Sequence, residues 1–73
     1  MKKITCKVFG QRFCTYCGKN EMYYFIDGRG HPYGSCSCGN EDWCDHETVE
    51  QVKQRFGSRL KPADIDTLTL YTD

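Results

Sequence analysis

The sequence predicts one small α+β domain, and three observations lead to this prediction. The chain has 73 residues, which leaves room for a single core, so residues 1–73 are assigned to one domain. Leu, Ile, Val and Phe number only 13, while six cysteines stand among the apolar positions. Segments with strand-like patterns lie on both sides of one short segment with a helical pattern. Because so thin a core cannot offset the entropy lost on folding, the fold needs another source of stability.

The first expected element is a strand over residues 3–9. Ile4, Cys6 and Val8 recur at every second position of this segment, which is typical of a half-buried strand. We therefore expect Cys6 to be a small buried core residue. The Gly-Gln pair at residues 10–11 then predicts a turn.

A β-hairpin is expected in the middle of the chain. The aromatic run at residues 22–26 predicts a strand with two apolar faces, and the glycines within residues 27–30 suit a tight turn. The return strand begins at residues 31–33, where Pro32 is tolerated at a strand start. Since one cysteine pair precedes this hairpin and another follows it, the two pairs are expected to meet at one end.

A short amphipathic helix and a closing strand complete the prediction. Apolar residues recur at helical spacing within residues 45–56, with Asp45 as the expected N-cap and Gly57 beyond the C-terminus. Residues 66–72 alternate Leu with Thr and Tyr, which predicts the C-terminal strand. The larger aromatic residues are expected in the core: Tyr23, Tyr24, Phe25, Trp43 and Phe56.

The cysteines carry the strongest chemical signal. Cys14 and Cys17 have two residues between them, Cys36 and Cys38 have one, and a glycine follows each pair. Such a turn points two sulfurs at one place and frees backbone amides to bond thiolates. Zn²⁺ prefers four soft ligands in a tetrahedron, and its binding contributes on the order of 10 to 16 kcal/mol to folding. The sequence therefore predicts a metal-stapled domain with one structural zinc ion on these four cysteines.

The chain resembles a zinc ribbon through Cys14-Thr15-Tyr16-Cys17-Gly18-Lys19 and Cys36-Ser37-Cys38-Gly39. The resemblance covers residues 12–45 and implies a β-hairpin with one cysteine-bearing knuckle on each side. The second motif has one spacer residue where two are usual, so other ligand sets stay open. One uses Cys44 or His46 in place of a second-motif cysteine, and another binds two ions with all six thiols and the histidines. His31 and His46 are otherwise expected on the surface.

The charges are grouped along the chain although their formal sum is zero. Residues 1–19 and 51–61 are basic, whereas residues 20–50 and 62–73 are mainly acidic. A neutral total disfavours nonspecific binding to nucleic acid, which depends on a surplus of Lys and Arg. Two basic surfaces for a protein partner are predicted instead, and they comprise Lys2, Lys3, Lys7 and Arg12, and Lys53, Arg55, Arg59 and Lys61.

The sequence gives no indication of an enzyme or of a small-molecule substrate. No serine lies in a strained nucleophile turn, and a metal with four protein ligands has no position for an activated water. A disulfide framework is disfavoured because the start of the chain lacks a secretory signal. A glutaredoxin-like dithiol site at Cys14 and Cys17 is an alternative, but in that family the second cysteine lies inside a helix whose N-terminus lowers the thiol pKa.

The resemblance implies a role in transcription, where zinc ribbons bind RNA polymerase subunits or nucleic acid. A chain of this size also resembles the small regulators with which bacteriophages inhibit or redirect host RNA polymerase. We therefore expect a cytoplasmic, non-membrane protein that binds polymerase, in the host cytoplasm if a phage encodes it. In the alternative nucleic-acid module, a sheet face would contact the strand through Lys7, Arg12, Lys19, Tyr23 and Tyr24.

Overall fold

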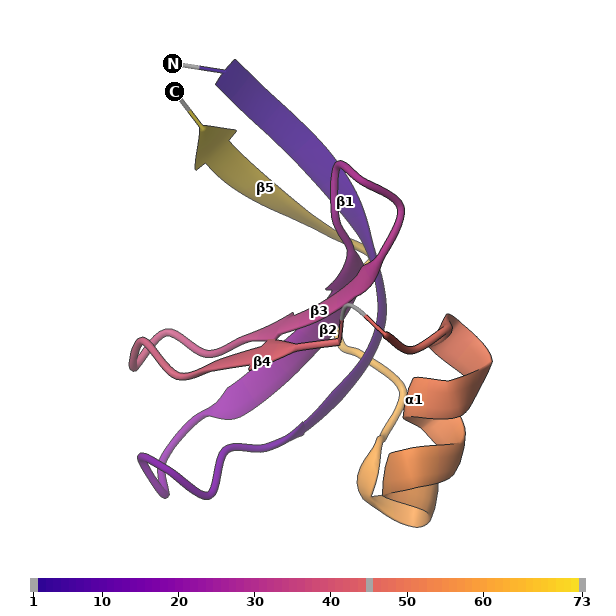
Figure 1. Ribbon diagram of the computed structural model, residues 1–73. Helices are drawn as coiled ribbons and strands as arrows, with labels where there is room; N and C mark the ends of the chain where they lie inside the picture. The colour runs from indigo at the N-terminus through magenta and orange to yellow at the C-terminus, as the bar shows by residue number, and fades with distance from the viewer. Residues whose placement is uncertain (1, 45, 73) are drawn as a thin grey trace.

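The structure, a computed structural model, describes residues 2–44 and 46–72 and shows one five-stranded antiparallel sheet with a helix on one side (Figure 1). The strand order is β4-β3-β2-β1-β5. The elements are β1 (Lys2–Phe13), β2 (Glu21–Ile26), β3 (Pro32–Ser35), β4 (Glu41–Trp43), α1 (Val49–Phe56), the 3₁₀ helix η1 (Gly57–Arg59) and β5 (Thr67–Thr72). This arrangement agrees with the predicted small α+β class. No helix in these two stretches is both long and apolar enough to cross a bilayer.

Strand β1 is longer than predicted and connects two parts of the sheet. Its first half pairs with β5, from Lys2↔Thr72 to Lys7↔Thr67, and its second half pairs with β2. The predicted turn at residues 10–11 is wrong, because the strand continues to Phe13 with a shift of register between Val8 and Gly10. The first half of β1 and β5 therefore extend together away from the other strands (Figure 1).

The predicted central hairpin is confirmed by the pairing of β2 with β3, from Tyr23↔Ser35 to Ile26↔Pro32. Asp27 holds the turn, since its Oδ1 accepts hydrogen bonds from the backbone N–H groups of Arg29 at 2.9 Å and of His31 at 3.1 Å. Strand β4, which the sequence analysis did not predict, then pairs with β3. The β1–β2 and β3–β4 connections consequently lie at the same end of the sheet (Figure 1).

The helix begins later than predicted. Thr48 is its N-cap: Thr48 Oγ1 accepts from the N–H of Gln51 at 3.2 Å, and Gln51 Oε1 accepts from the N–H of Thr48 at 2.8 Å. This reciprocal pair satisfies two amides that the first turn leaves free. The prediction that Asp45 caps the helix fails, since α1 starts at Val49; Asp45 itself lies outside the described residues. Gly57 ends the helix with a φ of 56°, as expected for a glycine there.

Side chains alternate between two apolar clusters on the two faces of β2. Met22 and Tyr24 pack with α1, while Phe25 packs with Cys6 on the other face. The buried position of Cys6 confirms its predicted place in the core. Trp43 does not lie in the core: it is 63% exposed, because β4 is an edge strand, and its ring packs edge-on against Tyr33.

Candidate metal centre

The first cysteine turn, residues 14–20, is called the first knuckle and joins β1 to β2. The N–H of Cys14 donates to the carbonyl of Asn20 at 2.9 Å, and the N–H of Gly18 donates to the carbonyl of Cys14 at 3.0 Å. Gly18 has a φ of 67°, a conformation that a residue with a Cβ rarely adopts. The glycine after Cys17 therefore permits the tight reversal that brings both sulfurs to one side.

The second knuckle, residues 36–40, joins β3 to β4 and repeats this plan with one spacer residue fewer. The N–H of Cys36 donates to the carbonyl of Asn40 at 2.9 Å, and the N–H of Gly39 donates to the carbonyl of Cys36 at 3.0 Å. Gly39 has a φ of 97°. Each knuckle thus has a cysteine and an asparagine closing the turn and a glycine with positive φ within it.

The four cysteine sulfurs of the two knuckles lie within 4.8 Å of one another. Across the knuckles, Sγ of Cys14 is 3.8 Å from Sγ of Cys38, and Sγ of Cys17 is 3.9 Å from Sγ of Cys36. A tetrahedral zinc site with bonds of about 2.3 Å has sulfur–sulfur edges of about 3.8 Å. The predicted meeting of the two cysteine pairs is confirmed, and their spacing fits a metal ion such as zinc.

Backbone amides stabilise the thiolate forms in the first knuckle. The N–H of Cys17 is the main cause that lowers the pKa of Cys14 to about 6. The N–H groups of Lys19 and then Asn20 lower the pKa of Cys17, and the second of these bonds is 3.5 Å long. Thiolates are the form in which cysteine binds a metal, so this turn favours ligation.

In the second knuckle, the pKa of the Cys38 thiol is raised rather than lowered. The N–H of Asn40 lowers the pKa of Cys38, but desolvation and the three neighbouring cysteines outweigh it and raise this pKa to about 12. Four negative sulfurs cannot lie this close together without a compensating cation. A divalent ion among the four sulfurs would supply positive charge and favour loss of the proton from Cys38.

Two asparagines that the sequence analysis did not identify also belong to this centre. Asn20 Nδ2 donates to Ser37 Oγ at 3.1 Å, and Asn40 Nδ2 lies 3.8 Å from Cys14 Sγ. Their signal in the sequence is that each follows the glycine of its knuckle within two positions. Both asparagines therefore connect one knuckle to the other.

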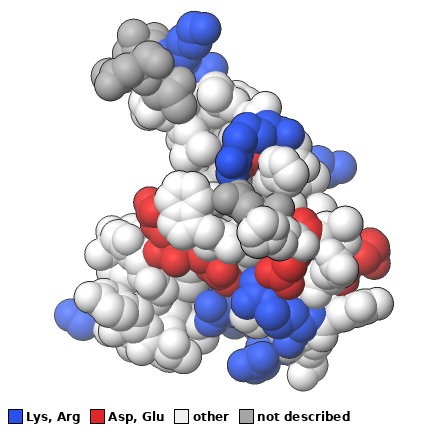
Figure 2. Space-filling model, viewed as in Figure 1, with Lys and Arg blue, Asp and Glu red and all other residues white. Residues whose placement is uncertain are grey.

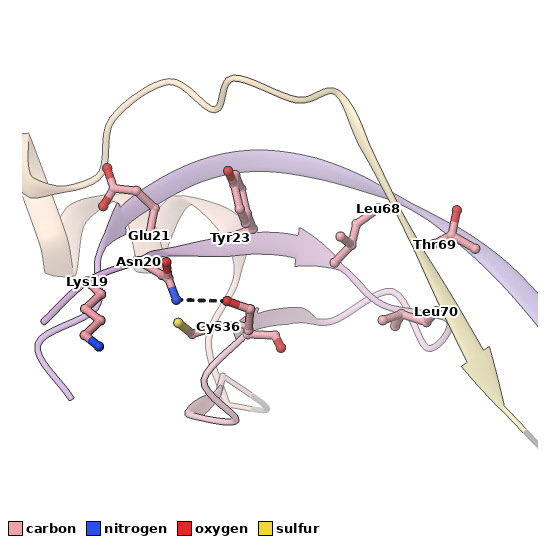
Figure 3. A pocket seen from close by; sticks show the side chains of 10 residues that line it. Lys19, Asn20, Glu21, Tyr23, Cys36, Leu68, Thr69 and Leu70 are labelled. Carbon is pink, nitrogen blue, oxygen red and sulfur yellow. Dashed lines mark hydrogen bonds between the residues drawn. The ribbon is translucent and has the colours of Figure 1, made fainter. Parts of the chain in front are cut away.

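A groove of about 640 Å³ lies beside the second knuckle, between the knuckle ends and β5 (Figure 3). Cys36 and Asn20 line one side of it, and Leu68 and Leu70 of β5 line the other. The hydrogen bond from Asn20 to Ser37 crosses this side of the groove. The Asn20–Ser37 hydrogen bond, which joins the two knuckles, therefore lies at the surface of the groove.

The alternative ligands do not join the sulfur group. Cys44 is buried in the core; its Sγ donates to the carbonyl of Asp42 at 3.6 Å and accepts from Arg55 Nη2 at 3.6 Å. His46 is exposed. Within residues 2–44 and 46–72, the metal-ligating side chains close enough to share an ion are Cys14, Cys17, Cys36 and Cys38.

The local fold also bears on the two competing thiol chemistries. The chain after Cys17 forms a turn and then β2, so the helix that a glutaredoxin-like site requires does not follow this cysteine. All six cysteines are free thiols in the structure. The local fold at Cys17 therefore differs from the one that a glutaredoxin-like dithiol site requires.

Comparisons with protein-family models, curated proteins and solved structures found no significant match. The structure itself supports the coarser statement that four cysteines lie close enough together for a zinc-binding site.

The residues predicted to bind a partner fall into two separate places. Lys2, Lys3 and Lys7 lie on the half of β1 that pairs with β5. Lys53 and Arg55 lie in α1, and Arg12 and Arg59 lie close to Phe56 of the same helix, with Lys61 in a pocket that Arg12 and Arg59 also line. Figure 2 shows a group of Lys and Arg side chains beside a band of acidic side chains. The guanidinium carbons nearest the centre of the Phe56 ring are those of Arg55 at 4.3 Å, Arg12 at 4.5 Å and Arg59 at 5.6 Å.

Contrary to the nucleic-acid alternative, Tyr23 and Tyr24 do not share one sheet face. Tyr24 is completely buried; its hydroxyl accepts from Arg12 Nε at 2.8 Å and donates to Asp42 Oδ2 at 2.7 Å. Tyr23 is half-buried and donates to Asp64 at 3.0 Å. That part of the prediction is wrong, because residues on alternate positions of β2 face two different clusters.

Proposed function

We propose that this protein is a small binding module whose fold is held by one structural zinc ion on Cys14, Cys17, Cys36 and Cys38. The observation that carries the metal assignment is the sulfur spacing, 3.8 and 3.9 Å across the knuckles, which matches the edges of a zinc–thiolate tetrahedron. The donor set supports it as well, since four thiolates are typical of structural zinc sites.

The zinc ion would have a structural role, stabilising the fold, rather than a catalytic one. Two connections of the sheet meet at the four sulfurs, so a bound ion would fix the ends of the β1–β2 and β3–β4 hairpins to each other. Binding free energies of about 10 to 16 kcal/mol at such sites become folding free energy. With four protein ligands the ion has no open position for substrate or water, so the proposal is a non-catalytic protein.

The partner we propose is a protein, and RNA polymerase is the first to test. The support is the resemblance to zinc ribbons, which are common in transcription, together with the gathering of basic residues around one aromatic ring. The proposed contact surface is this helix-end cluster, defined as Arg12, Arg55 and Arg59 around Phe56 together with Lys61, which lines a pocket with Arg12 and Arg59. Lys53 lies on α1 with Arg55, whereas the lysines of β1 lie on the part of that strand that pairs with β5.

Native mass spectrometry of the purified protein tests the metal, before and after acidification. One zinc ion per chain is expected, released in acid because four thiolates must be protonated. Cys14→Ser is expected to abolish stoichiometric binding, while Cys44→Ser serves as the matched control with its thiol outside the site. A chain with no metal, or equal binding by both variants, refutes the assignment.

Purified core RNA polymerase tests the partner in a surface-binding measurement with zinc-loaded protein. Arg59→Glu is expected to weaken binding by at least tenfold, since it reverses a charge in the cluster. Lys19→Glu makes the same change of charge on the first knuckle and is expected to bind like the wild type. Absence of binding by the wild type rejects polymerase as the partner without touching the metal assignment.

A further inference from the structure

The three arginines around Phe56 differ in their electrostatic partners. Arg55 Nη2 pairs with two carboxylates, at 2.7 and 3.3 Å. Arg12 and Arg59, in contrast, have no carboxylate partner in residues 2–44 and 46–72. Two positive charges that the fold leaves uncompensated lie beside the same ring.

Both of these guanidinium groups are nevertheless held in place. Arg12 donates through Nε to Tyr24 Oη at 2.8 Å and through Nη1 to the carbonyl of Phe13 at 3.3 Å. Arg59 donates at 3.4 Å each to two carbonyls within residues 55–56. In the described part of the chain, Nη2 of Arg12 and Nη1 of Arg59 have no acceptor. Donors that are already ordered lose less entropy when a ligand binds.

Arg12 and Arg59 line a common pocket of about 330 Å³ beside the first knuckle. Lys61 and the hydroxyl-bearing residues Thr15 and Ser58 complete its polar lining, and Phe13, which is 51% exposed, supplies an apolar wall. A volume of this size holds one or two side chains. Cations, hydroxyls and an aromatic ring together suit an oxyanion that has an apolar neighbour.

The surroundings of the pocket distinguish a compact anion from a long polyanion. Lys61, which lines the pocket, pairs with Glu21, and the neighbouring Arg55 pairs with two carboxylates. Figure 2 shows a band of Asp and Glu side chains next to a group of Lys and Arg side chains on the face that it draws. A nucleic-acid strand that extended past the pocket would meet this band, and like charges repel. A single acidic side chain avoids it.

We propose that this pocket binds the carboxylate of an acidic peptide segment of a protein partner. Arg12 and Arg59 receive the carboxylate through paired N–H donors, which suits the planar guanidinium. An apolar side chain next to the acidic residue packs on Phe13. This inference rests on the proposed function, because it names the kind of segment that the helix-end cluster recognises.

Fluorescence anisotropy tests the proposal on zinc-loaded protein with a labelled eight-residue peptide that has one Glu next to one Leu, Gly and Ser at the other positions and an amidated C-terminus. The wild type is expected to bind it, more weakly as salt increases. Arg59→Gln should weaken binding by about tenfold or more, and Arg59→Lys should also weaken it because Lys lacks the planar fork. Lys19→Gln removes the same charge from outside the pocket and should change affinity less than twofold.

Three results overturn the proposal: no binding of this peptide, equal affinity of Arg59→Gln and wild type, or tighter binding of a single-stranded oligonucleotide than of the peptide at physiological salt. The Nε–H signals of Arg12 and Arg59 in an NMR titration show independently whether these two side chains contact the peptide. Cobalt absorbance of every variant reports the metal centre separately. Loss of the cobalt absorbance would refute the metal assignment, whereas loss of peptide binding with the cobalt absorbance intact would refute the peptide site alone.

Discussion

Asn20 Nδ2 donates a hydrogen bond of 3.1 Å to Ser37 Oγ, which ties the first knuckle directly to the second (Figure 3). The two residues come from different connections of the sheet, one before β2 and one after β3. Contacts of this kind outside the ligand set orient the ligands before a metal arrives. The bond therefore leads to a prediction about metal affinity.

Ser37→Ala removes the acceptor of that bond and is expected to lower zinc affinity by about tenfold, the lower end for outer contacts of metal sites. Competition with a chelator of known affinity measures the change. Thr15→Ala, an equally small change at a spacer of the first knuckle, is the control and should retain the wild-type affinity. Equal affinities of all three proteins would show that the bond does not orient the cysteines.

Gly34→Ala is expected to lower the free energy of unfolding by about 1 to 3 kcal/mol. A Cβ at Gly34 would lie 2.6 Å from Cε2 of Tyr24, and this ring cannot move away because it is completely buried and bonded to Arg12 and Asp42. Chemical denaturation of the zinc-loaded protein measures the loss.

Gly28→Ala is the matched control for this substitution. Its Cβ would be 3.4 Å from Cδ1 of Ile4, an ordinary contact, so we expect a change within about 0.5 kcal/mol. Equal stability of the two alanine variants would show that the structure has room for a Cβ at position 34 beside the Tyr24 ring.

Thr48→Ala removes one half of the reciprocal cap with Gln51 and is expected to cost about 1 kcal/mol of unfolding free energy. Thr48→Ser keeps the hydroxyl and should restore most of the loss. Denaturation curves of the two variants, recorded under identical metal loading, provide the measurement. A serine variant as unstable as the alanine variant would place the effect in the methyl group instead.

Cys44 produces a pH dependence in the alkaline range. Burial first, and then the charge of Asp42, raise the pKa of this thiol from 9.0 to about 11. Between these values the unfolded chain releases the proton and the folded chain keeps it, so the thiol's contribution is complete below pH 9 and disappears as the pH rises through 11. Cys44→Ala should therefore flatten the decline of unfolding free energy in this range.

The slope against pH decides that experiment, because the alanine variant also loses packing and starts from a lower stability. Denaturation at several pH values from 8 to about 11.5 gives both slopes. Parallel curves for the two proteins would assign the alkaline decline to other groups.

The locally encoded parts of the fold were predictable. The hairpin around Asp27 depends on turn glycines within the segment, and the strand at the C-terminus depends on alternating Leu and Thr. The meeting of the four cysteines follows from that hairpin, since one pair flanks each of its strands. These features need no information from distant residues.

The errors arose where distant residues decide the structure. A Cβ at Gly10 would lie 2.8 Å from Cγ of Leu60, so this glycine serves a close approach within β1 rather than a turn. Trp43 is exposed because β4 has no strand beyond it. The grouping of Arg12 with Arg59 around Phe56 brings together two segments that charge patterns alone had assigned to separate surfaces.

The pairing of Lys2 with Thr72 has a consequence for the order in which the molecule assembles. Joining β1 to β5 closes a loop that spans almost the whole chain, and the entropic cost of closure grows with loop length. Contacts so distant in sequence slow folding, whereas hairpins form quickly. We expect the knuckle hairpins to form early and the docking of β5 to be the slow, final event, so truncation before Thr67 should spare the first phase and remove the last.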